Sequence, residues 1–159
     1  MRVYNIYTKN MKIKETKPNI GKRILAGLID YFIIYSFFFY YIFTFGEPNG
    51  EGEYHISGLP GLIPIIFWGI ITIGIEQWFG ATIGNMLVKL KPKSIYNTSE
   101  FSTLNEVNKI TVIQSFKRHL LDPIDIFFFG LVGIILIKNT EKNQRLGDIW
   151  ANTIVINKI

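Results

Sequence analysis

The sequence predicts an all-α membrane protein. The expected fold is a helical hairpin of two transmembrane helices, with a third broken or re-entrant membrane segment and a small cytoplasmic loop region. Composition is the first indication, because 48% of the 159 residues are hydrophobic and 15% are aromatic, which is high for a small soluble protein. The second is a pair of apolar runs, at about residues 22–45 and 59–79, each long enough to cross a bilayer as a helix.

A basic arm of 19 residues precedes the first span. The arm contains several lysines and a single acid, Glu15. It is expected either to be solvated in the cytoplasm or to lie on anionic lipid. Residues 20–159 then form one membrane domain. The apolar run after the arm is too long for a cleavable signal peptide and ends without a small-residue cleavage site, so we expect a retained span.

The placement of charge sets the orientation of the hairpin. The loop at residues 46–58 carries three glutamates and no lysine or arginine, whereas residues 80–119, after the second span, are basic. The positive-inside rule therefore places the N-terminal arm and residues 80–119 in the cytoplasm and the acidic loop outside. The aromatic end of the first span is expected at the outer membrane interface.

The cytoplasmic region is expected to contain three short elements. Residues 86–96 alternate loosely between apolar and polar and are compatible with a strand. Residues 97–105 are rich in Asn, Ser and Thr and are expected to be a loop. Residues 111–121 are expected to form a short amphipathic helix whose basic end approaches the membrane.

The third apolar segment, residues 120–137, has two interpretations. It is just long enough to cross a bilayer, but Asp122, Pro123 and Asp125 lie near its start and two glycines follow. Both of its flanks are basic, so a simple crossing would leave one basic flank outside. A broken or re-entrant segment would keep both flanks inside, with its irregular backbone covered by protein or lining a cavity.

Asp30 is the most informative residue of the chain. It lies within the first span, seven residues after Arg23 and therefore roughly 10 Å deeper along the axis, on the same helix face. A carboxylate at that depth costs about 2.5 to 3.5 kcal/mol, so it must be paired, protonated or in contact with water. Glu76 lies roughly 5 Å inside the cytoplasmic end of the second span, either in the same pocket or in headgroup water.

Further charged residues approach the membrane from the same side, namely Arg118, Asp122 and Asp125. Their convergence with Arg23 and Asp30 indicates a polar pocket that opens to the cytoplasm. Such a pocket either binds a proton or cation or fixes the packing of the helices.

The sequence also excludes several kinds of site. It has no cysteine, so neither a disulfide framework nor a thiolate metal site is possible. No phosphate-cradling loop, zinc-ligand spacing or Ser/His/Asp triad is evident, and we expect the isolated His55 and His119 to be solvated. We therefore expect no enzymatic activity, no cofactor, no metal and no nucleic-acid partner.

Three segments carry a family resemblance. GKRILAGLIDYF contains Arg23 and Asp30, GATIGNMLVKL contains a Gly-x-Thr-x-Gly element, and QRLGDIWANTIVI contains Asp148. In this order and spacing they resemble the signatures of the RDD family of small bacterial membrane proteins, named for one arginine and two aspartates. The match identifies Arg23 with the arginine, and Asp30 and Asp148 with the two aspartates, and it places Gln144 and Arg145 beside the second aspartate.

The resemblance spans about residues 18–156, with departures at Asn85 and Asn152, where the family often has Lys and Gly. It implies a multi-pass protein of the bacterial cytoplasmic (inner) membrane, for which the charge pattern places the N-terminus in the cytoplasm. The family is associated with transport, and some members are linked to sodium/proton exchange. It also implies that Asp148 lies on the cytoplasmic face, so we expect it to contact Arg23.

Two functions follow as hypotheses. The first is a small transporter or transporter subunit for a proton, cation or small ligand, in which Asp30 binds the ion, Arg23 tunes it and Glu76 is a secondary carboxylate. Three short membrane segments make a thin pathway, so the expected partners are the lipid bilayer and either a second copy or another membrane protein. The alternative is a non-transporting scaffold or assembly factor with a structural polar network.

The same polar network has secondary members under both hypotheses. They are Arg118, Asp122, Asp125, Gln144 and Arg145.

Overall fold

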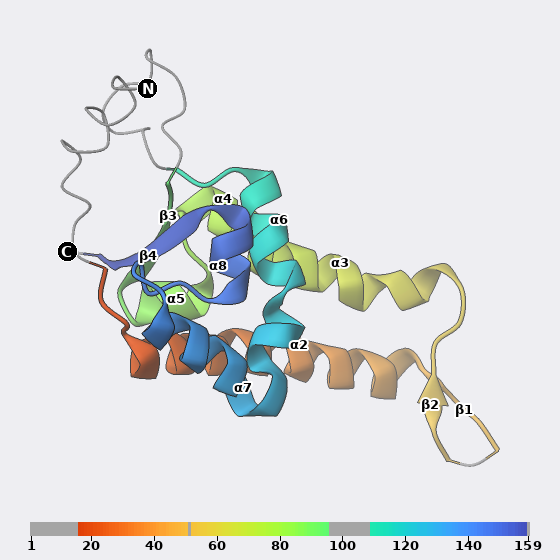
Figure 1. The fold of residues 1–159 in the computed structure, drawn as a ribbon. Coiled ribbons are helices and arrows are strands. Elements are labelled where there is room, and N and C mark those ends of the chain that lie inside the picture. Colours follow the sequence, from red (N-terminus) through yellow and green to blue (C-terminus); the bar gives the residue numbers. More distant parts are fainter. Residues whose placement is uncertain (1–15, 51, 96–108, 159) are drawn as a thin grey trace, which may run out of the picture.

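A computed structural model describes residues 16–50, 52–95 and 109–158. Most of the expected basic arm (residues 1–15) and the expected loop at residues 97–105 lie outside this described part. The fold has a long helical hairpin at one end and a cluster of short helices with a small sheet at the other (Figure 1).

The hairpin consists of the two expected spans. The first is helix α2 (Ile20–Phe45), and the second runs from Leu59 to Phe79. Both are long and apolar enough to cross a membrane. Their surfaces are largely exposed apolar side chains, such as Phe32 at 74% and Trp78 at 85%, which is the surface expected of helices that face lipid.

The second span is not a uniform helix. It comprises a 3₁₀ turn η1 (Leu59–Leu62), helix α3 (Ile63–Gly69), a π-helical turn η2 (Ile70–Gly74) and helix α4 (Ile75–Phe79). Pro60 and Pro64 fall in the first turns of η1 and α3, where their missing N–H groups cost least.

Aromatic side chains join the two arms near their connection. The rings of Phe37 and Phe67 stack with centroids 3.8 Å apart, and the Tyr41 hydroxyl donates to the Pro60 carbonyl at 3.0 Å. The connection itself is a short β-hairpin in which β1 (Glu47–Pro48) pairs with β2 (Tyr54–His55).

The chain after the second span is only partly as expected. Residues 83–87 form helix α5 (Ile83–Leu87), and the strand that was expected over residues 86–96 is confined to β3 (Leu90–Ser94). β3 pairs antiparallel with β4 (Thr153–Asn157), from Leu90 opposite Asn157 to Ser94 opposite Thr153. The all-α expectation was therefore incomplete, because the β-branched run of β4 closes a sheet with a strand far away in sequence.

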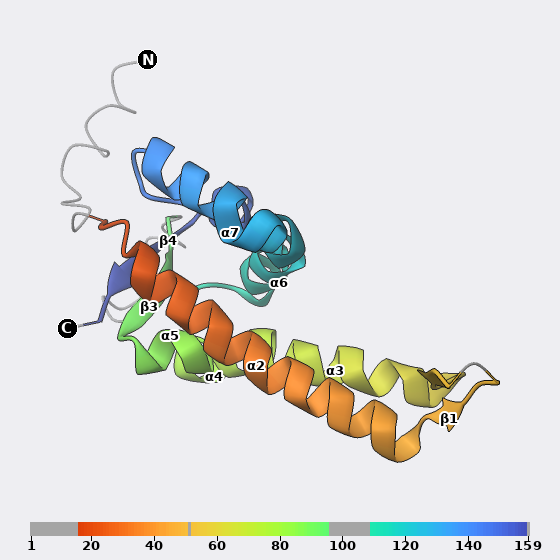
Figure 2. The same cartoon turned by 90° about the horizontal axis from the view of Figure 1, so that it is seen from below.

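Three helices complete the fold: α6 (Val112–Leu120), α7 (Asp122–Asn139) and α8 (Leu146–Ala151). α6 agrees with the expected amphipathic helix and starts with a capping box between Thr111 and Gln114. α7 covers the third apolar segment but is interrupted at Gly130, whose φ of +83° is not helical. Figure 2 shows α7 lying beside the N-terminal half of α2.

The interior is polar. Among the described residues, buried polar and charged side chains outnumber buried hydrophobic ones. Many of them lie where α2 packs on α5 and α6 packs on α8, and Asp148 links these helices through Arg23 and Arg118. The fold therefore turns apolar surface outward and polar side chains inward, as expected when the surroundings are lipid.

A close approach of two helices positions α5 on α2. A Cβ atom placed on Gly84 would lie 2.1 Å from the carbonyl oxygen of Ala26, so only glycine allows the two backbones to touch.

We expect Gly84→Ala to lower the free energy of unfolding by about 1 to 3 kcal/mol, the usual cost of overpacking, because α5 must move away from α2. Thermal unfolding of the detergent-solubilised protein measures the effect. Gly27→Ala is the matched control, since a Cβ there meets nothing within 4 Å. Equal melting temperatures for the two variants would contradict the packing argument.

Candidate functional site

The candidate site is built around Asp148, the second aspartate singled out in the sequence. Its carboxylate is fully buried on α8. It accepts hydrogen bonds from Nη1 of Arg23 at 3.0 Å and from Nε of Arg118 at 2.9 Å. Arg23 also donates to the carbonyl of Asn143 at 2.8 Å. The contact expected between Arg23 and Asp148 is therefore present, and it joins the start of α2 to α8.

Glu76 extends this network to the second span. Its side chain is 0% exposed, which rules out the expected alternative of a carboxylate in headgroup water. It forms an ion pair with Arg118 and lies 3.3 Å from Nε2 of His119. The other ring nitrogen of His119 lies 2.8 Å from Oδ2 of Asp122. The expectation that His119 is solvated was therefore wrong, since its ring bridges two buried carboxylates.

Arg145 binds the acids at the start of α7. Its Nη1 lies 2.6 Å from Oδ1 of Asp122, and its Nε lies 3.8 Å from Oδ2 of Asp125. Asp125 in turn accepts the backbone N–H groups of Leu146 and Gly147, at 3.0 and 3.2 Å. This carboxylate therefore holds the first turn of α8, which positions Asp148.

Gln144 has a structural role beside this group. Its amide Nε2 donates to the carbonyl of Thr153 at 2.7 Å, and its backbone N–H donates to Oγ1 of Thr140 at 2.7 Å. Gln144 therefore ties the turn before α8 to the start of β4 and does not contact the charged groups through its side chain.

Asp30 stands apart from the network. Its side chain is buried, at 7% exposure, and it accepts hydrogen bonds from Oγ1 of Thr82 at 2.6 Å and from the N–H of Gly84 at 2.7 Å. Arg23, the partner considered from the sequence, binds Asp148 instead. Within the described ranges, no basic side chain forms an ion pair with Asp30.

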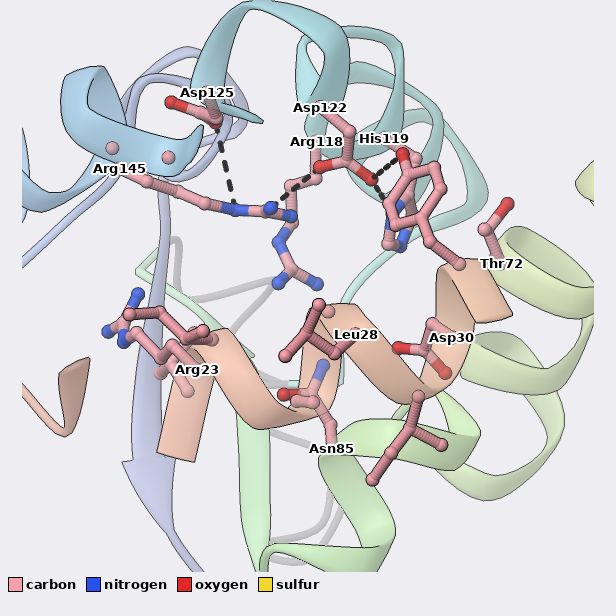
Figure 3. A pocket seen from close by; sticks show the side chains of 18 of the residues that line it. Arg23, Leu28, Asp30, Thr72, Asn85, Arg118, His119, Asp122, Asp125 and Arg145 are labelled. Atoms are coloured by element: carbon pink, nitrogen blue, oxygen red, sulfur yellow. Dashed lines mark hydrogen bonds and ion pairs between the residues drawn. The ribbon is translucent and has the colours of Figure 1, made fainter. Parts of the chain in front are cut away.

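A cavity of about 930 Å³ separates α2 from α6 and α7. Asp30, Arg118 and Arg145 all line it, and apolar side chains of α2 and α7 make up most of the remaining wall. Figure 3 shows Arg118 and Arg145 on one side, with Asp30 across the cavity on α2. The arrangement is an apolar chamber with a charged side, which is the usual composition of a ligand pocket.

The charges of the network reinforce one another. Burial by itself would lower the pKa of His119, but the carboxylates of Asp122 and Glu76 outweigh this and raise it to about 9. Burial by itself would raise the pKa of Asp148, but the guanidinium groups of Arg118 and Arg23 outweigh it and hold the pKa well below its usual range. At neutral pH the histidine is therefore charged and the aspartate is ionised.

Sequence reasoning gave no site role to Thr82, which lies in the Gly-x-Thr-x-Gly element, or to His119, which was expected to be solvated. A signal for His119 was present, because Gln114, Ser115, Arg118 and His119 share one face of α6 and all four are buried. A polar stripe at helical spacing beside a membrane span marks an inward face. In the described part of the chain, no group of three or more metal-ligating side chains is arranged to hold a metal ion.

The protonated His119 makes folding stability depend on pH. Its pKa is raised from 6.5 to about 9, so the folded state binds the proton more tightly. The stabilisation is fully present below about pH 6.5 and is lost as pH rises through about 9.

We expect the melting temperature to fall as the pH rises from about 7 to about 10. The free energy of unfolding should fall by up to roughly 3 kcal/mol over the same range. Thermal unfolding across this range measures it. His119→Gln should flatten the profile, whereas His55→Gln, on the exposed strand β2, should keep the wild-type shape. A wild-type slope in His119→Gln would show that another group titrates.

Removing the charge of Asp148 should destabilise the protein strongly. Asp148→Asn keeps the side-chain volume but leaves the buried guanidinium of Arg118 with one anion fewer, and breaking a buried ion pair costs about 3 to 5 kcal/mol. Thermal unfolding in detergent measures the loss. Glu141→Gln, an equal charge change on an exposed residue, is the control, and similar melting temperatures for the two variants would contradict the prediction.

Comparison with known proteins identifies a family. The model of the RDD family matches residues 17–152, a range that includes Arg23, Asp30 and Asp148. No curated protein and no solved structure matches the chain. The family match covers most of the sequence, and the matched range contains two apolar helices that are compatible with membrane spans. The chain belongs to the RDD family.

Proposed function

We propose that this protein is a small transporter, or a transporter subunit, that moves a proton or a monovalent cation by way of Asp30. The proposal includes no enzymatic step. The observation that carries it is a buried carboxylate, inside a candidate span, that lines a cavity and forms no ion pair with any described basic side chain.

The balance of charge around the cavity supports this role. In the network and at Asp30 together, four basic side chains stand against five acidic ones, and the set comprises Arg23, Arg118, His119, Arg145, Asp30, Glu76, Asp122, Asp125 and Asp148. With His119 protonated, one negative charge is left without a counter-charge. It resides on Asp30, because each of the other acids lies next to an arginine or the histidine. An uncompensated buried charge is costly, so a proton or a cation bound at Asp30 stabilises the site.

The geometry around Asp30 suits reversible binding of a proton or cation. Oδ1 and Oδ2 of Asp30 receive one donor each, from Gly84 and Thr82, while carboxylate oxygens have further lone pairs. Thr82 also accepts from the side-chain amide of Asn85 at 2.9 Å, which fixes its hydroxyl as a donor to Asp30. The carboxylate is therefore held in place whether or not an ion is bound.

We further propose a topology in which the third segment is re-entrant and both termini face the cytoplasm, in the bacterial inner membrane. Two contacts support it. The side chain of Asn143, just after α7, donates to the carbonyl of Thr16 at 2.7 Å, and Arg118, just before the third segment, binds the same carboxylate, Asp148, as Arg23 at the start of α2. Both flanks of the third segment thus lie near the start of α2, and the break at Gly130 lets the chain turn back.

A homo-oligomer or a membrane-protein partner belongs to the same proposal, since a single copy offers a thin pathway. The second candidate is a non-transporting scaffold or assembly factor. It is favoured by the hydrogen bonds from Thr82 and Gly84, because they also serve to anchor α5 on α2. In that case Asp30 would hold the fold and move nothing.

Flux measurements in proteoliposomes separate the two candidates. We expect the wild type to dissipate an imposed pH or sodium gradient and Asp30→Asn to reduce this flux to the level of empty liposomes, because the amide cannot take up a proton or balance a cation. Glu53→Gln is the matched control, because Glu53 is exposed in the connection between β1 and β2, and this variant should keep the wild-type flux.

Thermal unfolding of the same samples reports on the fold. Asparagine keeps one acceptor for Thr82 or Gly84, so Asp30→Asn should remain folded. Absence of flux in the folded wild type, together with a lower melting temperature for Asp30→Asn, would favour the scaffold and overturn the transporter proposal.

A further inference from the structure

Helix α6 is turned inside out for a helix in water. Four of its polar side chains, those of Gln114, Ser115, Arg118 and His119, are buried, whereas its apolar side chains point away from the protein. The exposed apolar residues are Val112, Ile113, Phe116 and Leu120. Ile113 is 68% exposed, so this face has no cover within the described part of the chain. A helix that has polar side chains on one face and an outward apolar stripe on the other is typical of the membrane interface.

The apolar stripe continues onto neighbouring elements. Ile149 and Trp150 of α8 are exposed, and α8 packs against α6. At the end of the second span, which α6 also contacts, Trp78 and Phe79 are exposed. We call the surface formed by Ile113, Phe116, Lys117, Leu120 and Trp150 the α6–α8 face.

The direction of α6 agrees with a position in the membrane plane. Figure 1 shows its axis crossing the direction of α2 and α3, and Figure 2 shows it from close to its end while α2 and α3 run across the view. If the hairpin crosses the bilayer along its own axis, α6 lies along the bilayer surface.

One cation stands within this apolar face. Lys117 is one helical turn from Ile113 and from Leu120, and its Nζ lies 5.3 Å from the ring centroid of Trp150. A lysine with an aromatic ring at the edge of an apolar surface is the usual combination at a bilayer interface, because the ring lies at headgroup level and the lysine extends its charge toward the phosphates.

Charge favours lipid over a second copy of the chain. In a two-fold symmetric interface the same patch meets itself, so two Lys117 side chains would be brought together in an apolar contact. An anionic headgroup instead provides Lys117 with a counter-charge, which no acidic side chain supplies within the described part of the chain.

We propose that the α6–α8 face lies in the membrane interface at the end where α2 begins, and that Lys117 and Trp150 bind an anionic phospholipid headgroup there. This lipid site is separate from Asp30 and holds whether or not the protein transports an ion. It places the polar network at the level of the headgroups, between the bilayer surface and the two spans.

Fluorescence quenching by brominated phospholipids tests the site. Trp68→Phe and Trp78→Phe leave Trp150 as the single tryptophan, since the chain has three. In proteoliposomes we expect strong quenching by brominated phosphatidylglycerol and weaker quenching by brominated phosphatidylcholine. Lys117→Gln should reduce this preference about fivefold, the usual contribution of one basic residue near an anionic surface. Lys158→Gln, an exposed lysine beyond β4, should leave it unchanged.

A second measurement uses the absence of cysteine from the chain. Ile113→Cys in the otherwise native protein carries a fluorescent label whose quenching by the same lipids does not depend on the tryptophan substitutions. Quenching of both reporters with a preference that depends on Lys117 supports the lipid site. Unquenched reporters, equal quenching by the two lipids, or efficient disulfide crosslinking of Ile113→Cys between copies would overturn it, the last by showing that the face is covered by a second copy.

Discussion

The structure depends on one buried carboxylate. Asp148 has no exposed surface, yet it is bonded to arginines from two other helices. A charge removed from water costs several kcal/mol unless it is paired and hydrogen-bonded. The ion pairs of Asp148 meet that condition only if α2, α6 and α8 are all in place. The charge therefore specifies one arrangement of the three helices, which apolar contacts in lipid would specify weakly.

The surrounding residues serve this requirement. Asp125 accepts the first N–H groups of α8 and so sets the depth of Asp148. Gly147 has no side chain, which allows α8 to approach the carbonyl of Arg118, where a Cβ would lie at 2.5 Å. Glu76 of the second span supplies a counter-charge to both Arg118 and His119 of α6. The outcome is a protein with its polar groups inside and its apolar groups outside, since lipid offers no hydrogen bonds to replace those made in the interior.

Asp30 belongs to a different part of this design. Its donors come from α5 rather than from the arginines, and the cavity separates it from the cluster (Figure 3). The neutral donors hold the carboxylate without cancelling its charge. The fold therefore divides its buried charges into an ion-paired network and one separate acid.

The amino-acid sequence by itself determined the two spans, the amphipathic helix α6 and the family, because these follow from local hydropathy, helical spacing and short motifs. It also indicated Arg23 and Asp30 as candidate site residues, since charge within or beside an apolar run is visible without a structure, and the family resemblance added Asp148. Only the tertiary structure decided their partners. Arg23 and Asp148 stand 125 residues apart. β3 and β4 also come from distant parts of the chain, and Thr82, although it lies in the Gly-x-Thr-x-Gly element, carried no sign that Asp30 is its partner. No local pattern states which of several carboxylates an arginine will meet, because that choice is made when all the helices pack and every buried charge must find its counter-charge at once.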